Sequence, residues 1–459
     1  MAWLATSGCL AALAALGGAD DEPPPALPKE FFADRRRALC ALVAGRVERG
    51  ERHLVVLRGA SAVADMARFY QDQNFYYLTG VSEPDLAVML TPDGATDQLL
   101  VPPFSRFTSQ WEGKRLAPGE AAAAQAGFAT VGNARRLSDR LTKWVGDEGE
   151  GVVLWTFERP QPNRTSTSSS VNGAASRQKR DTFDGRRTRE EAFVDALSKR
   201  FPNAEIRDVT PLLHELRGVK TAAEIAQVRA ATVIATHGIA EAMRSVRPGV
   251  YEFQLAAAAR YVFSRMGAGP DAYAAIVGAG PNGCVLHYSA NQRRIREDDL
   301  IVMDYGATAH GYCTDVTRTF PASGRFSAAQ RKLVTDVHEV QQEILAAVKP
   351  GARISKLDAL CSKALRARGY VRAHGPCHHV GLAVHDVGGD VLEPGMVITV
   401  EPGAYLRDAG MGCRIEDVVL VTEDGYECLS AGLPADPDGI EELMRAAGIH
   451  SAPVGLTRG

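Results

Sequence analysis

Apolar and polar positions alternate differently in the two halves of this chain. From Lys29 onward, apolar residues recur at helical spacing, which predicts a surface helix at the start of the first half. Helical spacing returns at residues 137–145 and 189–200. Short apolar runs predict strands at residues 53–57, 74–80, 86–90, 99–103, 152–157 and 206–209. This alternation predicts a small α/β domain with a mixed sheet.

Polar and proline-rich segments mark the ends of this first domain. Residues 1–28 form an apolar leader followed by a linker that contains Pro23 to Pro28. Residues 163–180, NRTSTSSSVNGAASRQKR, are polar and of low complexity, which predicts a mobile loop. We assign residues 29–215 to the first domain and residues 216–450 to the second.

The second half begins with long helical patterns and continues with β-rich segments. Helices are predicted at residues 222–246, 252–266, 327–348 and 355–368. The β-rich segments cover residues 274–320 and 376–430. The chain has no internal repeat at the level of its sequence. The expected architecture is therefore two α/β (α+β) domains.

Composition and charge exclude some classes of function. The chain has 459 residues and a net charge of −3, so nothing points to a nucleic acid or to an anionic membrane surface as a partner. Its eight cysteines contain no Cys-x-x-Cys pair and are interpreted as small buried side chains. No segment predicts a transmembrane span.

The N-terminal segment MAWLATSGCLAALAALGGA leaves the location of the protein open. It is apolar and ends in small residues, as a signal peptide does, but no Lys or Arg precedes Lys29. Either it is a truncated signal sequence and the protein is exported, or it is an apolar leader of a cytoplasmic protein.

Two carboxylates draw attention to the segment IVMDYGATAHGYCTDVTRTF, residues 301–320. Asp304 ends an apolar run, and Asp315 lies eleven residues later in what is predicted to be a second, paired strand. Residues 307–311 are predicted to turn the chain back between them. Two Asp residues in a hairpin usually cap it or face solvent, so the pair alone does not establish a site.

Three downstream segments add further metal-ligand side chains. Residues 374–389 contain His374, His378, His379 and His385, while Glu401 ends a β-branched strand and Glu416 lies early in the predicted strand 413–421. A carboxylate in such a strand is costly to bury unless it is paired, hydrogen-bonded or coordinated. Oxygen-rich ligation with a single imidazole favours Mn, Mg, Fe or Co, and four carboxylates suit two cations.

These segments resemble the metallopeptidases that include methionine aminopeptidase, prolidase and aminopeptidase P. The resemblance covers residues 218–422, and the motif H-x-x-G-L-x-V-H matches from His378 to His385. It implies a C-terminal "pita-bread" catalytic domain. It also implies a ligand set of one histidine and four carboxylates, which are Asp304, Asp315, His378, Glu401 and Glu416.

The resemblance also implies how these ligands divide between two divalent ions, of which Mn²⁺ is expected and Co²⁺, Zn²⁺ or Fe²⁺ are alternatives. Asp304 would hold one ion, and His378 and Glu401 the other. Asp315 and Glu416 would bridge the two. The attacking nucleophile would be a water acidified by both ions, with Glu401 as the acceptor of its proton.

Four further roles follow from the same resemblance. His287 and His385 would hold the scissile carbonyl and stabilise the oxyanion. His374 matches a residue of the substrate pocket, whereas His379 is interpreted as packing. Arg414 was expected to orient Asp304, because a residue two before Glu416 lies on the same face of a strand.

The first domain indicates which subgroup of the family this chain resembles. Residues 72–90, DQNFYYLTGVSEPDLAVML, resemble part of the N-terminal domain of aminopeptidase P. In that domain an F-Y-Y-L-T-G strand precedes a Glu-Pro turn. We therefore expect an aminopeptidase that releases the N-terminal residue of peptides with proline in second position, acting as a homo-oligomer (a dimer or tetramer). The alternatives are an Xaa-Pro dipeptidase (prolidase), a non-catalytic binding module and a metal-free creatine amidinohydrolase. The last two classes lose the ligand set, which is intact here.

Overall fold

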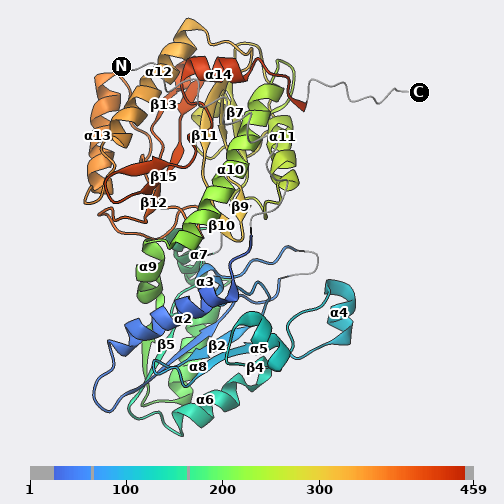
Figure 1. The fold of residues 1–459 in the computed structure, drawn as a ribbon, viewed down its shortest axis with the longest axis vertical. Helices are drawn as coiled ribbons and strands as arrows, with labels where there is room; N and C mark the ends of the chain where they lie inside the picture. The colour runs from blue at the N-terminus through green and yellow to red at the C-terminus, as the bar shows by residue number, and fades with distance from the viewer. Residues whose placement is uncertain (1–24, 64–66, 163–165, 450–459) are drawn as a thin grey trace. The chain divides into compact units, whose positions relative to one another are not determined.

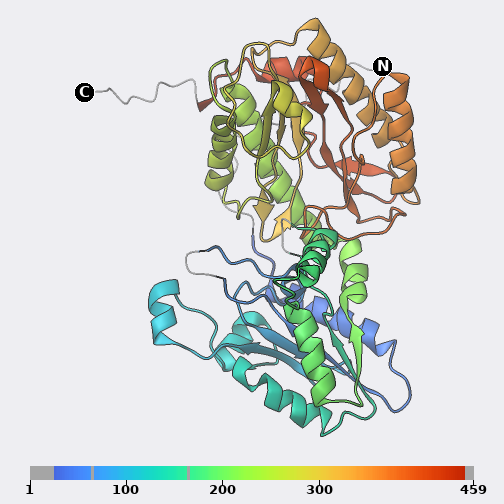
Figure 2. The ribbon, with the colours of Figure 1, turned by 180° about the vertical axis from the view of Figure 1, so that it is seen from behind.

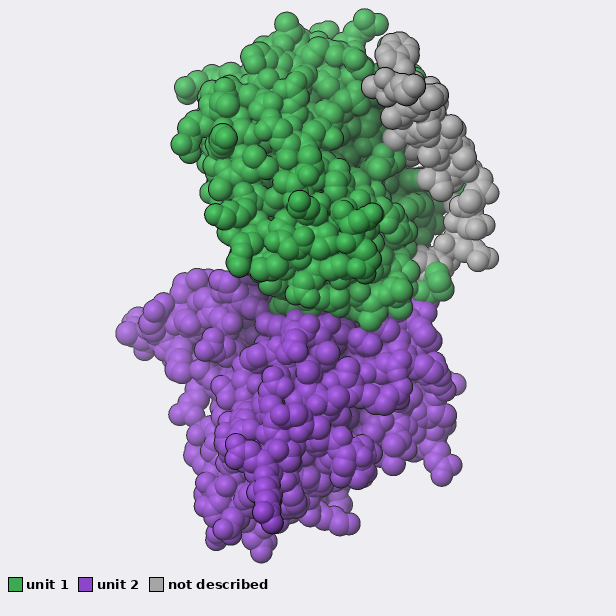
Figure 3. Space-filling model, turned by 60° about the vertical axis from the view of Figure 1, so that its left-hand side comes forward, with its two compact units in different colours: residues 1–25, 218–459 green, residues 26–217 purple. Residues whose placement is uncertain are grey.

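The structure is a computed structural model that describes residues 25–63, 67–162 and 166–449 (Figure 1). It divides into two compact units, one of residues 26–217 and one that contains residues 218–449 (Figure 3). The leader predicted at residues 1–19 lies outside the described residues. No helix in the described part of the chain is long and apolar enough to cross a membrane.

The unit of residues 26–217 is built on a six-stranded mixed sheet of order β4-β3-β2-β1-β5-β6. β1 pairs in parallel with β5 and antiparallel with β2. The strands are β1 (Arg52–Arg58), β2 (Ala87–Leu90), β3 (Asp97–Val101), β4 (Thr130–Asn133), β5 (Val152–Thr156) and β6 (Glu205–Asp208). The mixed sheet confirms the predicted α/β class.

Helices cover this sheet and add side chains to its core. They are α2 (Lys29–Ala44), α3 (Gln73–Thr79), α4 (Arg106–Glu112), α5 (Glu120–Ala126), α6 (Leu137–Val145), α7 (Ser168–Arg180), α8 (Arg189–Arg200) and α9 (Thr210–Gly218). Leu141 of α6 and Leu197 of α8 pack on Leu54 and Leu154 of the central strands. Each such buried side chain contributes about 1.5–3 kcal/mol relative to an exposed one.

Two sequence predictions in this unit were wrong. Residues 74–80 form helix α3, with Gly80 at its C-terminus in the left-handed conformation, and not a strand. Nearly every side chain of α3 is buried, so the segment lacks the polar face that gives a helix its period. Most of the predicted loop 163–180 is helix α7, which buries no side chain and begins with a capping box between Thr167 and Ser170.

The second unit holds its strands between two pairs of helices (Figures 1 and 2). The helices are α10 (Ala222–Ser245), α11 (Glu252–Arg265), α12 (Ala328–Leu345), α13 (Ile354–Ala367) and α14 (Pro437–Leu443). The strands are β7 (Ile276–Ala279), β8 (Leu300–Asp304), β9 (Thr308–Ala309), β10 (Tyr312–Cys313), β11 (Thr317–Pro321), β12 (Val397–Val400), β13 (Gly403–Leu406), β14 (Met411–Arg414), β15 (Asp417–Val421) and β16 (Tyr426–Cys428). They form two three-stranded sheets, β11-β8-β7 and β12-β15-β16, and two short ribbons.

The acidic side chains of this unit lie where its strands end or are interrupted. β8 pairs with β11, but the ladder is interrupted after Asp304↔Thr317, and Asp315 lies in this interruption. The predicted turn at 307–311 is a tight turn at His310 and Gly311, both with positive φ, between β9 and β10. The strand predicted at 413–421 was wrong as a single element, because it breaks between β14 and β15 and leaves Glu416 at the break.

Candidate metal centre

The ends of six strands bring four carboxylates together in the second unit. Asp304 is the last residue of β8, Asp315 lies between β10 and β11, and Glu401 follows β12. Glu416 lies between β14 and β15 and bridges to Thr317. Asp304, Asp315 and Glu416 are buried, with 7%, 6% and 1% of their surface exposed. The interruptions between strands thus direct the acidic side chains toward one space, and the paired strands on either side fix the backbone that carries them.

The loop that carries His378 is fixed along β12. The His378 backbone N–H donates to Thr399 Oγ1 (3.1 Å), and the N–H groups of Thr399 and Glu401 donate to the carbonyl oxygens of His378 and Pro376, both at 2.8 Å. These bonds extend the register of β12 to the loop. His378 is therefore held beside Glu401.

The imidazole of His378 faces the carboxylates through Nε2. This atom lies 3.5 Å from Asp315 Oδ2, 3.3 Å from Glu401 Oε1 and 3.9 Å from Glu416 Oε1. Nδ1 lies 3.1 Å from the carbonyl oxygen of His379, a bond that needs a proton on Nδ1. In the neutral ring Nε2 then has a free lone pair directed at the acidic cluster, as a metal-ligating histidine requires.

Burial and mutual repulsion change the acidity of this cluster. Burial, followed by the charge of Asp315, raises the pKa of Asp304 to about 7. Burial likewise raises the pKa of Glu401 to about 7 and that of Glu416 well above its ordinary value. Burial also opposes ionisation of Asp315, but the hydrogen bond and charge of His378 lower its pKa.

A divalent cation fits this arrangement. Asp315, His378 and Glu416 each offer one ligand atom, and these atoms lie within 4.8 Å of one another. Glu416 Oε1 is buried without a hydrogen-bond partner among the described residues, an expensive state for a carboxylate oxygen. A cation would satisfy this oxygen and relieve the repulsion that raises the three pKa values.

The structure adds two residues that the sequence prediction missed. The phenol of Tyr273 lies within hydrogen-bond distance of Oδ1 of both Asp304 and Asp315. Thr317 Oγ1 donates to Glu416 Oε2 at 2.6 Å. The role of Thr317 could have been predicted from the sequence, because Thr317 lies opposite Asp304 in a hairpin. The role of Tyr273 could not have been predicted, because Tyr273 is 31 residues away from Asp304 and lies in no motif.

Arg414 does contact Asp304, but the predicted reason was wrong. Its Nη2 lies 2.6 Å from Asp304 Oδ2, and both side chains are buried. Arg414 and Glu416 do not share a strand, since Arg414 ends β14 and Glu416 lies beyond it. The contact arises because Arg414 is bonded to β11, where its backbone N–H donates to Thr319 Oγ1 and its Nε donates to Thr317 Oγ1.

Three further predicted histidines have different surroundings. The ring of His385 lies 4.2 Å from that of His378, centroid to centroid. His374 Nδ1 lies 3.6 Å from Glu401 Oε2, and its Nε2 lies 2.9 Å from the hydroxyl of Tyr405. His287 is exposed. Burial is the main cause, with His287 a smaller one, that lowers the pKa of both His374 and His385 to about 4.

The remaining candidates have packing roles. His379 is buried, and its Nε2 lies 2.9 Å from the carbonyl oxygen of Gly389. Cys284, Cys313 and Cys413 are buried free thiols, and Cys377 is half-buried. Burial raises the pKa of the thiols of Cys284, Cys377 and Cys413, which disfavours the reactive thiolate.

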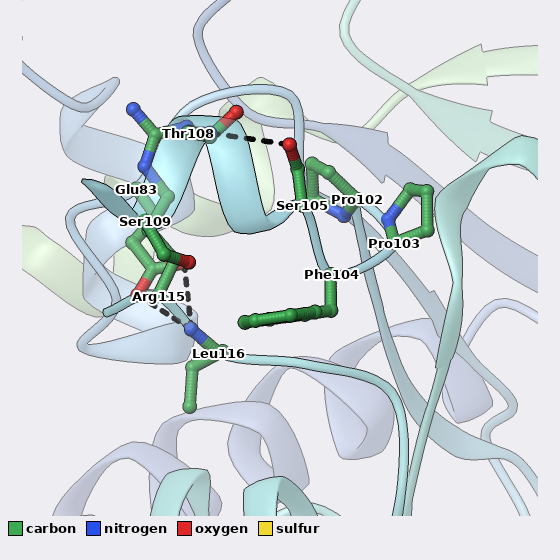
Figure 4. Close-up of a pocket in the computed structure, with 9 residues that line it drawn as sticks. All are labelled: Glu83, Pro102, Pro103, Phe104, Ser105, Thr108, Ser109, Arg115 and Leu116. Carbon is green, nitrogen blue, oxygen red and sulfur yellow. Dashed lines mark hydrogen bonds between the residues drawn. The ribbon is translucent and has the colours of Figure 1, made fainter. Parts of the chain in front are cut away.

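A separate hollow lies in the unit of residues 26–217, at the base of α4 (Figure 4). Pro102, Pro103 and Phe104 form one side of it. The Glu83 carboxylate accepts from the Leu116 backbone N–H at 3.0 Å, and the Ser105 hydroxyl caps α4 by accepting from the Thr108 N–H. Because its one carboxylate anchors the loop, we assign no chemistry to this hollow.

Both units of this chain match families of known proteins. The sequence model of Metallopeptidase family M24 matches residues 226–423, and that of the Aminopeptidase P N-terminal domain matches residues 32–155. The chain is 32% identical over 416 residues to Xaa-Pro aminopeptidase of Escherichia coli K12, covering 83% of this chain and 90% of that protein. It is 29% identical to the mitochondrial intermediate cleaving peptidase 55 of Arabidopsis thaliana, covering 93% and 85% of the two chains.

Solved structures give the same relationship. Zn-substituted Escherichia coli aminopeptidase P in complex with product superposes with a TM-score of 0.75 at 29% identity, covering 92% of this chain and 99% of that one. Aminopeptidase PepP of Pseudomonas aeruginosa superposes with a TM-score of 0.76 at 28% identity, covering 92% and 98%. The similarity therefore extends over both units.

Proposed function

This chain belongs to the aminopeptidase P group of metallopeptidase family M24, and on that premise we propose that it is a metal-dependent aminopeptidase that releases the N-terminal residue of peptides with proline in second position. The observation that carries the proposal is the convergence of Asp315, His378 and Glu416 on one space in the second unit. The relatives named Xaa-Pro aminopeptidase supply the reaction class.

Membership of a metallopeptidase family and this cluster support the use of a divalent metal. We propose two ions per subunit, with Mn²⁺ as the working metal, because four carboxylates supply more charge than one ion needs. The residues that would hold them are Asp304, Asp315, His378, Glu401 and Glu416. When bound, the ions polarise the scissile carbonyl and lower the pKa of the attacking water.

The protein's own residues then hold the substrate and move the protons. Glu401 would accept a proton from the attacking water. His385 and His287 would donate hydrogen bonds to the oxygen that gains negative charge. Arg414 favours the ionised form of Asp304 through the 2.6 Å ion pair.

Recognition of proline in second position requires a pocket shaped to its ring. A prolyl nitrogen carries no N–H, so recognition cannot use the donor on which general peptidases rely. His374 lies beside Glu401 and Tyr405, with its pKa lowered to about 4 chiefly by burial. A neutral imidazole at the edge of the cluster suits contact with an uncharged prolyl ring, and we assign His374 to substrate binding.

The alternatives differ in what they require. A dipeptidase must bind the free carboxylate that follows proline, whereas an aminopeptidase leaves that side open. The Xaa-Pro aminopeptidase relatives and the match of residues 32–155 do not favour prolidase. The intact acidic cluster opposes a non-catalytic module.

The decisive experiment compares two matched peptides. One is an Xaa-Pro dipeptide, and the other is the same peptide extended by two residues. We expect a kcat/KM at least about tenfold higher for the extended peptide, a difference of about 1.4 kcal/mol. A preference for the dipeptide would assign the protein to the prolidases, with the same metal site.

Metal removal is the control for this assay. Exhaustive chelation is expected to abolish cleavage of the extended peptide, and Mn²⁺ is expected to restore it. Full activity after complete removal of metal would contradict the metal-dependent mechanism. Substitution of Phe183, which is 99% exposed and lies outside the cluster, is expected to leave both results unchanged.

We further propose that the protein works as a homo-oligomer on peptide substrates, without nucleic acid. The supporting feature is α4 and the residue before its cap, where Phe104, Phe107 and Trp111 are 60%, 73% and 73% exposed. Three exposed aromatic side chains on one short segment are unusual for a monomer surface and are typical of an interface.

A further inference from the structure

Behind the acidic cluster lies a second, fully buried polar cluster formed by Arg318, Gln341, Asp417 and Ser430. Thr317 and Arg318 are neighbours in β11, and successive side chains of a strand point to opposite faces. Thr317 donates to Glu416 on the side of the proposed metal site, so Arg318 points to the other side. The second cluster therefore contacts the ligand-bearing strands from behind.

Gln341 links the two strand ends that carry glutamates. It lies on α12, and its Nε2 lies 2.9 Å from Asp417 Oδ2, 3.2 Å from the Val400 carbonyl oxygen and 3.5 Å from the Ile415 carbonyl oxygen. Val400 directly precedes Glu401, and Ile415 directly precedes Glu416. One side-chain amide thus links the backbones of two proposed ligands, next to the β12–β15 ladder that pairs Val400 with Asp417.

Arg318 and Asp417 complete the support. Arg318 Nη1 donates to the Glu416 carbonyl oxygen at 2.7 Å, and its Nη2 donates to Asp417 Oδ1 at 2.6 Å. Asp417 Oδ1 also accepts from the Ser430 hydroxyl at 2.6 Å. The Glu416 carbonyl oxygen and the Asp417 carboxylate are therefore held by charge-assisted bonds, which are stronger than neutral ones.

The state of Gln341 argues against a role in stability alone. Its Oε1 is buried and has no hydrogen-bond partner among the described residues. An orphaned acceptor costs about 1–3 kcal/mol, a cost that an apolar side chain of similar volume would avoid. What an apolar side chain cannot supply is the bond that fixes Val400 and Ile415 against the repulsion between Glu401 and Glu416.

We propose that Gln341 is a positioning residue for the metal site: it holds the backbones that carry Glu401 and Glu416 at the separation a divalent cation needs. The inference rests on the proposed metal site. It differs from that proposal in that Gln341 touches neither metal nor substrate and acts only through the two strand ends.

The test is the variant Gln341→Met, which keeps the volume and removes the amide. We expect its affinity for Mn²⁺, measured by calorimetric titration of the metal-free full-length protein, to fall by about 10–100-fold, the usual effect of losing a partner that orients ligands. We expect the Tm of the metal-free variant to fall only modestly, because the variant removes the orphaned Oε1 but also takes a donor away from Asp417 Oδ2 and two carbonyl oxygens. Excess Mn²⁺ should restore its kcat.

The matched control is Gln342→Met. Gln342 is the next residue on α12 and is exposed, and its side chain makes a hydrogen bond to His338 Nε2 at 3.3 Å. Its Mn²⁺ affinity is expected to equal that of the wild type. If Gln341→Met does not fold, Gln341→Leu takes its place, since it also removes the amide at similar volume.

The outcomes separate the two proposals. If the wild type binds Mn²⁺ and Gln341→Met binds it equally well, the positioning role is wrong and the proposed function stands. A lower Tm of the metal-free variant with unchanged Mn²⁺ affinity would assign Gln341 a merely structural role. If the wild type itself does not bind a divalent ion, the proposed function fails first.

Discussion

Two neighbouring histidines of the site are driven to opposite protonation states. Burial would lower the pKa of His378, but its hydrogen bond to Asp315 and the surrounding carboxylates raise it to about 9. Loss of hydration, followed by the positive charge of His378, lowers the pKa of His385 to about 4. At neutral pH and without metal, His378 thus supplies the positive charge of the cluster, and His385 is a neutral hydrogen-bonding group.

This difference predicts distinct effects of substitution. In His385→Ala the metal content should be unchanged, because His385 lies outside the acidic cluster, while kcat should fall by about 10²–10³-fold, the usual cost of one lost oxyanion donor. Metal analysis and steady-state kinetics at saturating Mn²⁺ measure the two quantities. His338→Ala, on α12, serves as the control. Stoichiometric loss of metal in His385→Ala would instead identify His385 as a ligand.

At the scale of single elements, helix α3 shows how tertiary burial overrides local preference. Its residues Phe75, Tyr77 and Leu78 favour strands or are neutral, yet their burial and the left-handed Gly80 define a helix. Asp72 stands at its N-terminus without a side-chain capping bond. Burial, followed by the charge of Glu190, raises the pKa of Asp72 to about 7.

The raised pKa gives a pH-dependent stability with a defined sign. Between about pH 4 and 7 the folded state holds a proton on Asp72 that the unfolded state has lost, so stability falls as pH rises through this window. Asp72→Asn removes the effect. We expect this variant to gain on the order of 2 kcal/mol over the wild type at pH 8 and much less at pH 5.

Urea unfolding of metal-loaded protein at the two pH values measures this gain. Asp139→Asn, an exposed change in an i,i+3 ion pair, is expected to show no such pH dependence. A gain in Asp72→Asn that is equal at pH 5 and pH 8 would show that Asp72 is ionised in the folded state throughout, and the explanation would be wrong.

At the scale of the whole molecule, the two units differ in what they expose. The unit of residues 218–449 buries its acidic cluster within its own strands, and each of its proposed ligands lies in that unit. The unit of residues 26–217 carries the exposed aromatic segment at α4, anchored by Glu83 at its base (Figure 4). Because the proposed ligands all lie in one unit, we propose that the other serves association or substrate selection.

Association through α4 is open to a direct test. Replacing Phe107 and Trp111 by serine removes two aromatic rings that lie 6.2 Å apart, centroid to centroid. We expect the wild type to sediment as an oligomer and the double variant to shift to a smaller species. Phe183→Ser is the control, as it removes an exposed aromatic side chain elsewhere. A monomeric wild type, or an unchanged double variant, would contradict the proposal.

The sequence by itself determined the class of the fold and the residues that converge in the second unit. Helices with a clear apolar face, such as 137–145 and 189–200, were predicted with their observed bounds, because one buried face leaves a period in the sequence. The acidic and histidine side chains were identifiable because their types and order form motifs along the chain. Their roles as ligands remain predictions.

Only the tertiary structure decided features that depend on contacts between distant residues. Helix α3 is almost fully buried, so its sequence lacks the alternation of apolar and polar faces that predicts a helix. The break at Glu416 depends on its bridge to Thr317, 99 residues earlier. The bond between Tyr273 and the aspartates leaves no local signal either. Nor does the bond between Gln341 and the two strand ends, 59 and 74 residues away, because the partners of a buried polar group are set by packing and not by neighbouring sequence.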